Sequence, residues 1–140
     1  MTRYLGLDIG SVRIGVALSD PLGMFAQGIA VLKASGDWIS ETAALVGRHG
    51  VSVVVIGLPL RTGGEEGPEA ARVREKARVL AQACPKVDIV FWDERFSTVI
   101  AERALLEADF SRKKRRGKID QTAAAVILQG FLDRKGGDLP

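Results

Sequence analysis

The chain has 140 residues, 46% of them hydrophobic, which predicts one globular domain over residues 1–140 and excludes a membrane span because no apolar stretch is long enough. Cys84 is the only cysteine, which excludes an intramolecular disulfide and disfavours a cysteine zinc site; with no evident signal peptide, we expect a cytoplasmic protein. Lysine and arginine outnumber the acids by 20 to 17, and the resulting net charge of +3 favours a polyanionic partner.

The first predicted element is a β-hairpin over residues 5–19 with a tight turn at Gly10. Strand alternation puts Gly6 and Asp8 on one face of the first strand, opposite small residues such as Gly15 on the second. A buried lone carboxylate is costly unless it is paired or binds a metal. Asp8 is therefore a candidate metal ligand. The alternative is that it only accepts hydrogen bonds from the backbone of the turn.

The other elements follow from hydrophobic periodicity, caps and breakers. They are a strand over 27–33, a helix from 38 capped by Asp37, a strand over 51–56, a helix over 69–83, a strand over 87–92, a helix over 98–107, a helix over 120–134, and a frayed tail over 136–140. This order predicts an α/β fold with a mixed five-stranded sheet, in which three antiparallel strands precede two parallel ones. Helices cover both faces of that sheet.

A glycine-rich and proline-rich loop over residues 57–68 follows the strand over 51–56 directly. In open α/β sheets, ligand-binding loops lie at the carboxyl ends of such strands. Arg61 in this loop and Arg95 after the next strand are candidate phosphate contacts.

Asp93 and Glu94 follow the strand over 87–92. Because successive side chains alternate, at most one of them faces the side of the sheet that Asp8 faces, and alternation alone does not choose between them. The alternative is that both are ordinary loop charges and that one caps the next helix. Ser97 or Thr98 could provide that cap instead, which weakens this alternative.

Asp120 stands at the predicted start of the last helix, one turn before Ala124 on the apolar stripe. The alternative is that it is an N-cap. Asp8, one strand-end acid and Asp120 would together suit a hard divalent cation, Mg²⁺ or Mn²⁺, and a two-metal site would hydrolyse a phosphodiester bond. Without a metal, three carboxylates at one point would repel one another.

A basic run lies just before Asp120, and its cations suit phosphate groups without reading sequence. The alternative is a solvated linker, which charge runs commonly are. The run consists of Arg112, Lys113, Lys114, Arg115, Arg116 and Lys118.

Taken together, four stretches resemble the YqgF/RuvX family of pre-16S rRNA nucleases and Holliday-junction-resolvase-like proteins. They are Leu5–Asp20, Val55–Gly67, Asp93–Thr98 and Asp120–Ala125. The resemblance implies an RNase H-like fold and metal-dependent cleavage of nucleic acid, with Asp8, Glu94 and Asp120 as the metal-binding acids. It is the resemblance that selects Glu94 over Asp93. It also implies that the reaction is 5′-end maturation of pre-16S rRNA and that the ribosome is a further partner. The protein is expected to act as a monomer or a homodimer.

Three alternative functions remain open at this point. A resolvase of four-way DNA junctions follows from a fold-level likeness to RuvC. A non-catalytic nucleic-acid-binding protein would use the basic run alone. The residues from Asp8 to Ser11 also resemble the phosphate loop of sugar kinases, heat-shock chaperones and actin. Those proteins bind ATP between two domains, and 140 residues supply only one.

Overall fold

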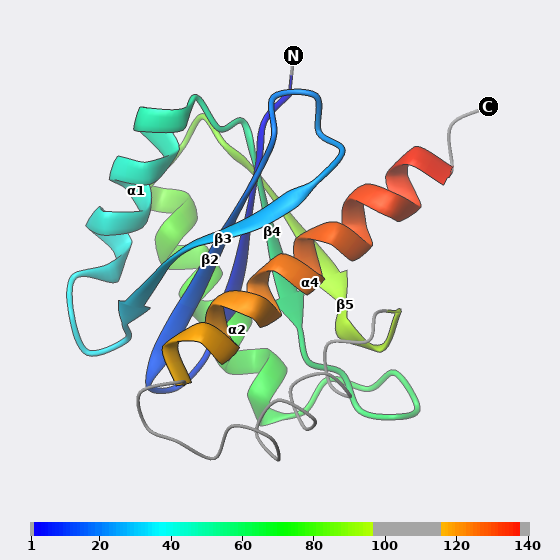
Figure 1. The fold of residues 1–140 in the computed structure, drawn as a ribbon. Coiled ribbons are helices and arrows are strands. Elements are labelled where there is room, and N and C mark those ends of the chain that lie inside the picture. Colours follow the sequence, from blue (N-terminus) through cyan, green and yellow to red (C-terminus); the bar gives the residue numbers. More distant parts are fainter. Residues whose placement is uncertain (1, 97–115, 138–140) are drawn as a thin grey trace.

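The computed structural model describes residues 2–96 and 116–137, and at 116–122 and 136–137 it describes the backbone alone. Five strands form one sheet in the order β3-β2-β1-β4-β5 (Figure 1). The strands are β1 (Tyr4–Ile9), β2 (Arg13–Ser19), β3 (Ala26–Lys33), β4 (Val53–Leu58) and β5 (Asp88–Asp93). In the described part of the chain, no helix is both long enough and apolar enough to cross a membrane.

Strand β1 lies at the centre of the sheet and carries Asp8 at its carboxyl end. It pairs antiparallel with β2, where Asp8 stands opposite Gly15, and parallel with β4. Strands β2 and β3 are antiparallel, and β4 and β5 are parallel. The predicted mixed sheet of three antiparallel strands followed by two parallel ones is confirmed.

Strands β4 and β5 begin and end later than the sequence predicts. The parallel ladder between β1 and β4 starts where Tyr4 meets Val53, and the Ser52 amide before it donates to the Arg3 carbonyl at 3.1 Å. The apolar run from residue 51 signals burial, but pairing with β1 decides where the strand begins. The ladder then continues through Gly57 to Leu58, which brings the carboxyl end of β4 beside Asp93 of β5.

Helices cover both faces of the sheet, as predicted (Figure 1). On one face, α1 (Trp38–His49) and α2 (Pro68–Ala83) pack on the larger core, which contains Leu5 and Leu7 of β1. On the other face, α4 (Arg116–Gly137) packs on a smaller core. Asp37 takes the N-cap position of α1 as predicted, but its side chain makes no capping hydrogen bond.

Helix α4 crosses the sheet at close range because β1 has no side chain at Gly6. A Cβ added to Gly6 would lie 2.7 Å from the Leu128 Cβ and 3.1 Å from the Ala124 carbonyl oxygen. Ala124 itself is fully buried. The small residues of this face therefore set the distance between helix and sheet.

The predicted limits of the last helix are wrong at both ends. Helix α4 begins at Arg116 rather than at 120, even though the added residues include Gly117, a poor helix former. Asp120 therefore lies inside the helix, and its alternative interpretation as an N-cap is wrong. Residues 136–137 are helical rather than frayed. The predicted helix over 98–107 and the last three residues lie outside the described residues.

Candidate active site

Asp8 and Glu94 line the same pocket, which has a volume of about 280 Å³. Both residues are buried, at 9% and 4% exposure. Asp8 comes from β1, and Glu94 opens a short 3-10 helix, η1 (Glu94–Phe96), directly after β5. Strand β4 lies between these two strands in the sheet. Two carboxylates far apart in the sequence therefore meet at the carboxyl edge of the parallel strands.

The rim of this pocket is the β1–β2 turn together with Pro59 of the glycine-rich loop. The Gly10 amide donates to the Arg13 carbonyl at 2.9 Å, and a Cβ at Gly10 would lie 2.7 Å from that same oxygen. Glycine is therefore required for the turn to close. Val12 is 61% exposed at the rim. Sequence reasoning located the turn but did not assign Ser11, Val12 or Pro59 to the site.

Glu94 reaches this pocket because β4 has a glycine beside it. A Cβ on Gly57 would lie 2.7 Å from the Glu94 Oε2 and 2.6 Å from the Ile127 Cδ1. Glu94 therefore lies on the α4 side of the sheet, the side that Gly6 and Asp8 face. The structure answers the question that alternation left open, since it places Glu94 rather than Asp93 beside Asp8 in the pocket.

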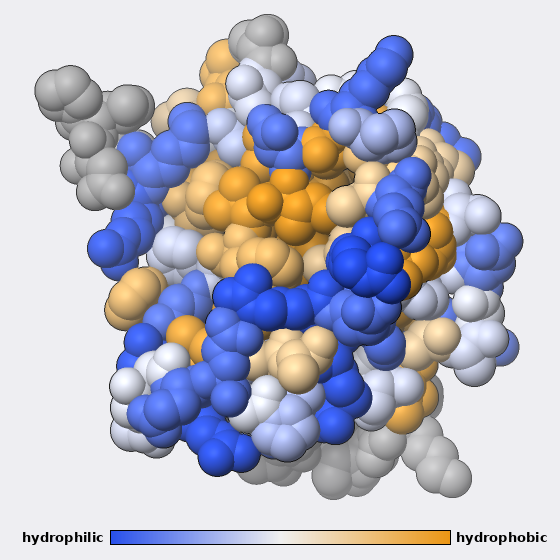
Figure 2. All heavy atoms as spheres, turned by 180° about the vertical axis from the view of Figure 1, so that it is seen from behind, coloured by the Kyte–Doolittle hydropathy of each residue, from blue (hydrophilic) through white to orange (hydrophobic). Residues whose placement is uncertain are grey.

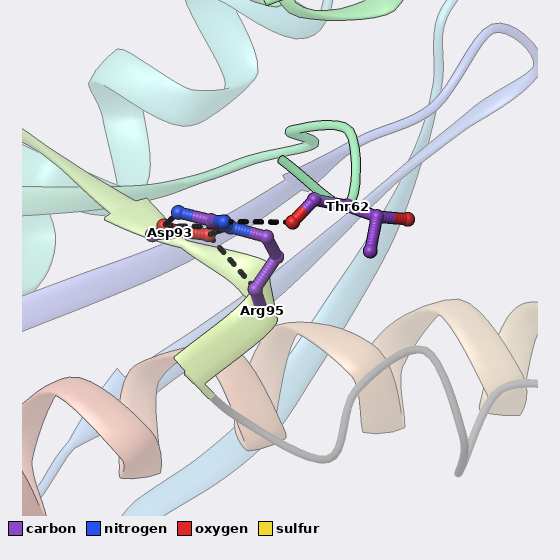
Figure 3. Close-up of polar contacts among 3 residues, drawn as sticks. All are labelled: Thr62, Asp93 and Arg95. Carbon is purple, nitrogen blue, oxygen red and sulfur yellow. Dashed lines mark hydrogen bonds and ion pairs between the residues drawn. The ribbon is translucent and has the colours of Figure 1, made fainter. Parts of the chain in front are cut away.

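Asp93 is engaged elsewhere, with Arg95 (Figure 3). The Arg95 Nη2 donates to Asp93 Oδ2 at 2.7 Å, and the Arg95 backbone amide donates to Oδ1 at 2.9 Å. The hydrogen bonds from Arg95 lower the pKa of Asp93. Arg95 also donates from Nη1 to the Thr62 carbonyl at 3.1 Å. Arg95, a predicted phosphate contact, thus ties the end of β5 to the glycine-rich loop.

The glycine-rich loop folds back on itself as a small hairpin. The Gly64 amide donates to the Arg61 carbonyl at 2.8 Å, and the backbones of Leu60 and Glu66 pair as an isolated antiparallel β-bridge. Gly64 has a φ of +94°, a conformation that favours glycine, and its Cα faces the Arg95 guanidinium. Arg61 is exposed on this loop, and its guanidinium packs across Gly67, whose Cβ would lie 2.6 Å from Nε.

The pairing of α4 with β1 indicates where Asp120 stands along the helix. The Phe131 ring lies 5.6 Å from the ring of Tyr4, and the Leu128 Cβ approaches Gly6. Increasing helix numbers therefore match decreasing numbers on β1, and α4 begins near the β1–β2 turn (Figure 1). Asp8 is the next residue after Gly6 on this face of β1. Moving in the same direction, toward the start of α4, reaches the helical turn that carries Asp120, so the α4 backbone brings this turn toward Asp8.

The side chain of Asp120 is outside the described residues, as are those of Arg116 and Lys118. Arg112, Lys113, Lys114 and Arg115 lie outside them entirely. Among the side chains that the structure does describe, no group of three metal-binding residues occurs. Of the three predicted acids, two are thus seen together, and the third is placed by its backbone.

A family model described as "RuvX: Holliday junction resolvase" matches residues 2–134. The chain belongs to the RuvX family. The resemblance to the YqgF/RuvX family that the sequence motifs indicate is thereby confirmed over nearly the whole chain.

RuvX relatives named "Putative pre-16S rRNA nuclease" match the chain along its length. The one from Moorella thermoacetica is 51% identical and covers 96% of both chains. That from Clostridium kluyveri is 47% identical over 94% of this chain and 97% of its own. That from Bacillus cereus is 46% identical over 95% and 99%.

Solved resolvases share the fold of this RuvX member at low sequence identity. Thermus thermophilus RuvC in complex with a Holliday junction substrate superposes with a TM-score of 0.62 at 15% identity, covering 98% of this chain and 97% of RuvC. The fowlpox virus Holliday junction resolvase gives a TM-score of 0.53 at 14% identity, covering 95% and 99%. The predicted RNase H-like α/β fold is confirmed by these neighbours.

Proposed function

We propose that this RuvX protein is a divalent-metal-dependent nuclease that hydrolyses phosphodiester bonds, with the 5′ end of pre-16S rRNA as its substrate. The observation that carries the proposal is the meeting of Asp8 and Glu94 in one pocket at the carboxyl edge of the sheet. Membership of the RuvX family and relatives named as pre-16S rRNA nucleases support the choice of reaction and of substrate. A cytoplasmic location follows from that substrate.

The residues at the pocket fit a hard cation such as Mg²⁺ or Mn²⁺. Carboxylate oxygens are the ligands these ions prefer, and Asp8 and Glu94 supply them at a pocket that also has room for water. Gly57 keeps the space beside the Glu94 Oε2 clear, since a larger residue would collide with that atom. Asp120 is the third ligand in this proposal, and the packing of α4 against β1 supports that choice, because it directs the start of α4 toward the β1–β2 turn.

When two such ions are bound, they lower the pKa of a water and stabilise the leaving oxygen of a phosphodiester. The protein contributes rigidity. Asp8 is fixed on the central strand, and Glu94 is fixed by η1 and by its packing beside Gly57 and Ile127. In this proposal, the basic run from Arg112 to Lys118 and the loop residue Arg61 hold the phosphates of the substrate. Arg95 serves chiefly to fix the loop.

A resolvase of four-way DNA junctions is the second candidate function. It is favoured by the family description and by the shared fold with RuvC bound to a junction. A resolvase would cut two symmetric strands and would act as a homodimer that matches the symmetry of the junction. A processing nuclease would prefer single-stranded or ribosome-bound RNA and has no such symmetry requirement.

The test compares Asp8→Asn with wild type on matched RNA, DNA and four-way-junction substrates with Mg²⁺ or Mn²⁺. We expect Asp8→Asn to lose cleavage by on the order of a hundredfold or more while binding is retained or tightens, because one repelling carboxylate is gone. The control is Asp88→Asn, the same change at an exposed position at the opposite end of β5, which should cleave like wild type.

Each outcome of this comparison identifies one function. Preferred cleavage of RNA supports the processing nuclease, and symmetric cleavage of the junction supports the resolvase. If the wild type binds nucleic acid but cuts none of the substrates with either metal, the protein is a non-catalytic binder. Wild-type cleavage by Asp8→Asn would show that the pocket is not the active site.

A further inference from the structure

A second pocket adjoins the candidate active site on the other side of the β1–β2 turn. It has a volume of about 220 Å³ and is lined by Ile9, Gly10, Ser11, Pro59, Glu69, Arg72, Val73 and Lys76. Ile9, Gly10, Ser11 and Pro59 also line the pocket of Asp8 and Glu94. The two pockets therefore lie on either side of the turn, and a strand that crosses the turn would pass from the acidic site to helix α2.

The far side of this second pocket is basic. Arg72 and Lys76 stand one helical turn apart on α2, so their side chains share a face of the helix. Within the residues that the structure describes, neither makes an ion pair. The other arginines of α2 behave differently, since Arg74 pairs with Glu66 at 2.7 Å and Arg78 pairs with Glu75 at 2.5 Å. The two cations that line the pocket are thus left available to a ligand.

The polar surroundings of these cations favour an anion of extended shape. One acid, Glu69, also lines the pocket, so two positive charges face one negative charge there. Ser11 supplies a hydroxyl donor where the two pockets meet, and Ile9, Val73 and Pro59 supply an apolar wall. A ligand that fits has anionic groups for the cations and an apolar part for the wall, as a sugar–phosphate chain does.

The face of the molecule that carries α2 has a matching surface. Helix α2 lies behind the sheet in Figure 1 and therefore on the near side of Figure 2. In Figure 2, strongly hydrophilic side chains run across the middle of this face, below an apolar area.

We propose that the α2 pocket binds the backbone of the nucleic-acid substrate next to the bond that is cut, through Arg72 and Lys76. The proposal rests on the proposed nuclease function and adds to it the course of the strand, across Gly10 and Ser11 and onto α2. A single strand fits this course, because the two pockets are separated only by a tight turn.

The experiment measures binding of fluorescein-labelled single-stranded RNA by anisotropy in EDTA, where no cleavage occurs, over a series of salt concentrations. The variant is Arg72→Gln/Lys76→Gln. We expect its affinity for RNA to fall on the order of tenfold. The negative slope of log K against log salt concentration should become shallower by about 1.4, since each phosphate contact on a single strand contributes about 0.7 to that slope.

The control is Arg78→Gln/Lys86→Gln, which removes one arginine and one lysine from exposed positions outside both pockets. Its slope should stay within error of wild type. Equal losses in the two double variants would overturn the proposal, because net charge alone would then explain the effect. So would an unchanged slope in the Arg72/Lys76 variant.

A failure of this proposal is distinguishable from a failure of the nuclease function. If wild type cleaves RNA and the Arg72/Lys76 variant keeps the wild-type slope, the nuclease stands and the α2 site is wrong. If wild type cleaves nothing while the slope falls as expected, the pocket binds nucleic acid and the catalytic role is wrong. Single-stranded DNA run in parallel reports whether the pocket distinguishes the two sugars.

Discussion

At the scale of single residues, glycines decide what the candidate active site can hold. Gly57 leaves room in β4 for both the Glu94 carboxylate and the Ile127 side chain. Gly6 and Gly10 do the same for helix α4 and for the β1–β2 turn. A site of buried carboxylates thus depends on positions that carry no chemistry themselves.

Gly57→Ala tests this dependence. The added Cβ would lie 2.6 Å from Ile127 and 2.7 Å from Glu94, so one of the two must move. We expect a loss of about 1–3 kcal/mol in the free energy of unfolding, measured by urea denaturation, together with weaker cleavage. Gly47→Ala is the control, because nothing lies within 4 Å of its Cβ in α1. That variant should gain up to about 1 kcal/mol. Similar effects of both changes would contradict the argument.

At the scale of elements, Arg95 joins the end of β5 to the glycine-rich loop that follows β4. It donates to the Asp93 carboxylate on one side and to the Thr62 carbonyl on the other (Figure 3). The Asp93 side chain is only 15% exposed, so this ion pair is partly shielded from solvent. The loop beside the pocket is therefore held by a charge pair that acid can break.

Asp93→Asn should remove a pH-dependent part of the stability. Arg95 lowers the pKa of Asp93 below its ordinary value of 3.8, so the folded state binds a proton less readily than the unfolded chain. The pair therefore stabilises the fold above that value, and the stabilisation disappears as pH falls through the lowered pKa. We expect urea denaturation to separate wild type from Asp93→Asn at about pH 7, and the difference to vanish in strong acid.

The matched control is Glu75→Gln, which breaks an ion pair of the same kind on the exposed surface of α2. Solvent screens that pair, and its removal should leave stability unchanged at both pH values. Hydrogen exchange at the Gly64 amide reports the loop itself and should become faster in Asp93→Asn alone. A pH-independent difference between wild type and Asp93→Asn would contradict the assignment.

At the scale of the whole molecule, the proposed site combines distant parts of the sequence. Asp8 comes from the first strand and Glu94 follows the last strand, and the third ligand in our proposal, Asp120, belongs to α4 near the other end of the chain. Binding a cation at this point would therefore link three parts of the chain. Anything that binds the folded state and not the unfolded one stabilises the fold by mass action.

Mg²⁺ or Mn²⁺ should raise the melting temperature of wild type, and EDTA should reverse the change. At a free metal concentration of about 100 Kd, the gain is about 2.7 kcal/mol. Asp8→Asn should lose most of this response, and Asp88→Asn should keep it. Calorimetry measures the effect without any substrate. An equal response in Asp8→Asn would place the cation elsewhere.

The sequence alone determined the sheet, the face on which Asp8 lies and the apolar stripe of α4. These follow from residue patterns with periods of 2 and 3.6, which the backbone imposes locally. Tertiary structure decided the rest. A 3-10 turn and the partner Arg95 separate Glu94 from Asp93, and pairing with β1 sets where β4 begins. The cations of α2 meet the β1–β2 turn only in the folded chain. Such contacts join residues distant in sequence, so no local pattern records them.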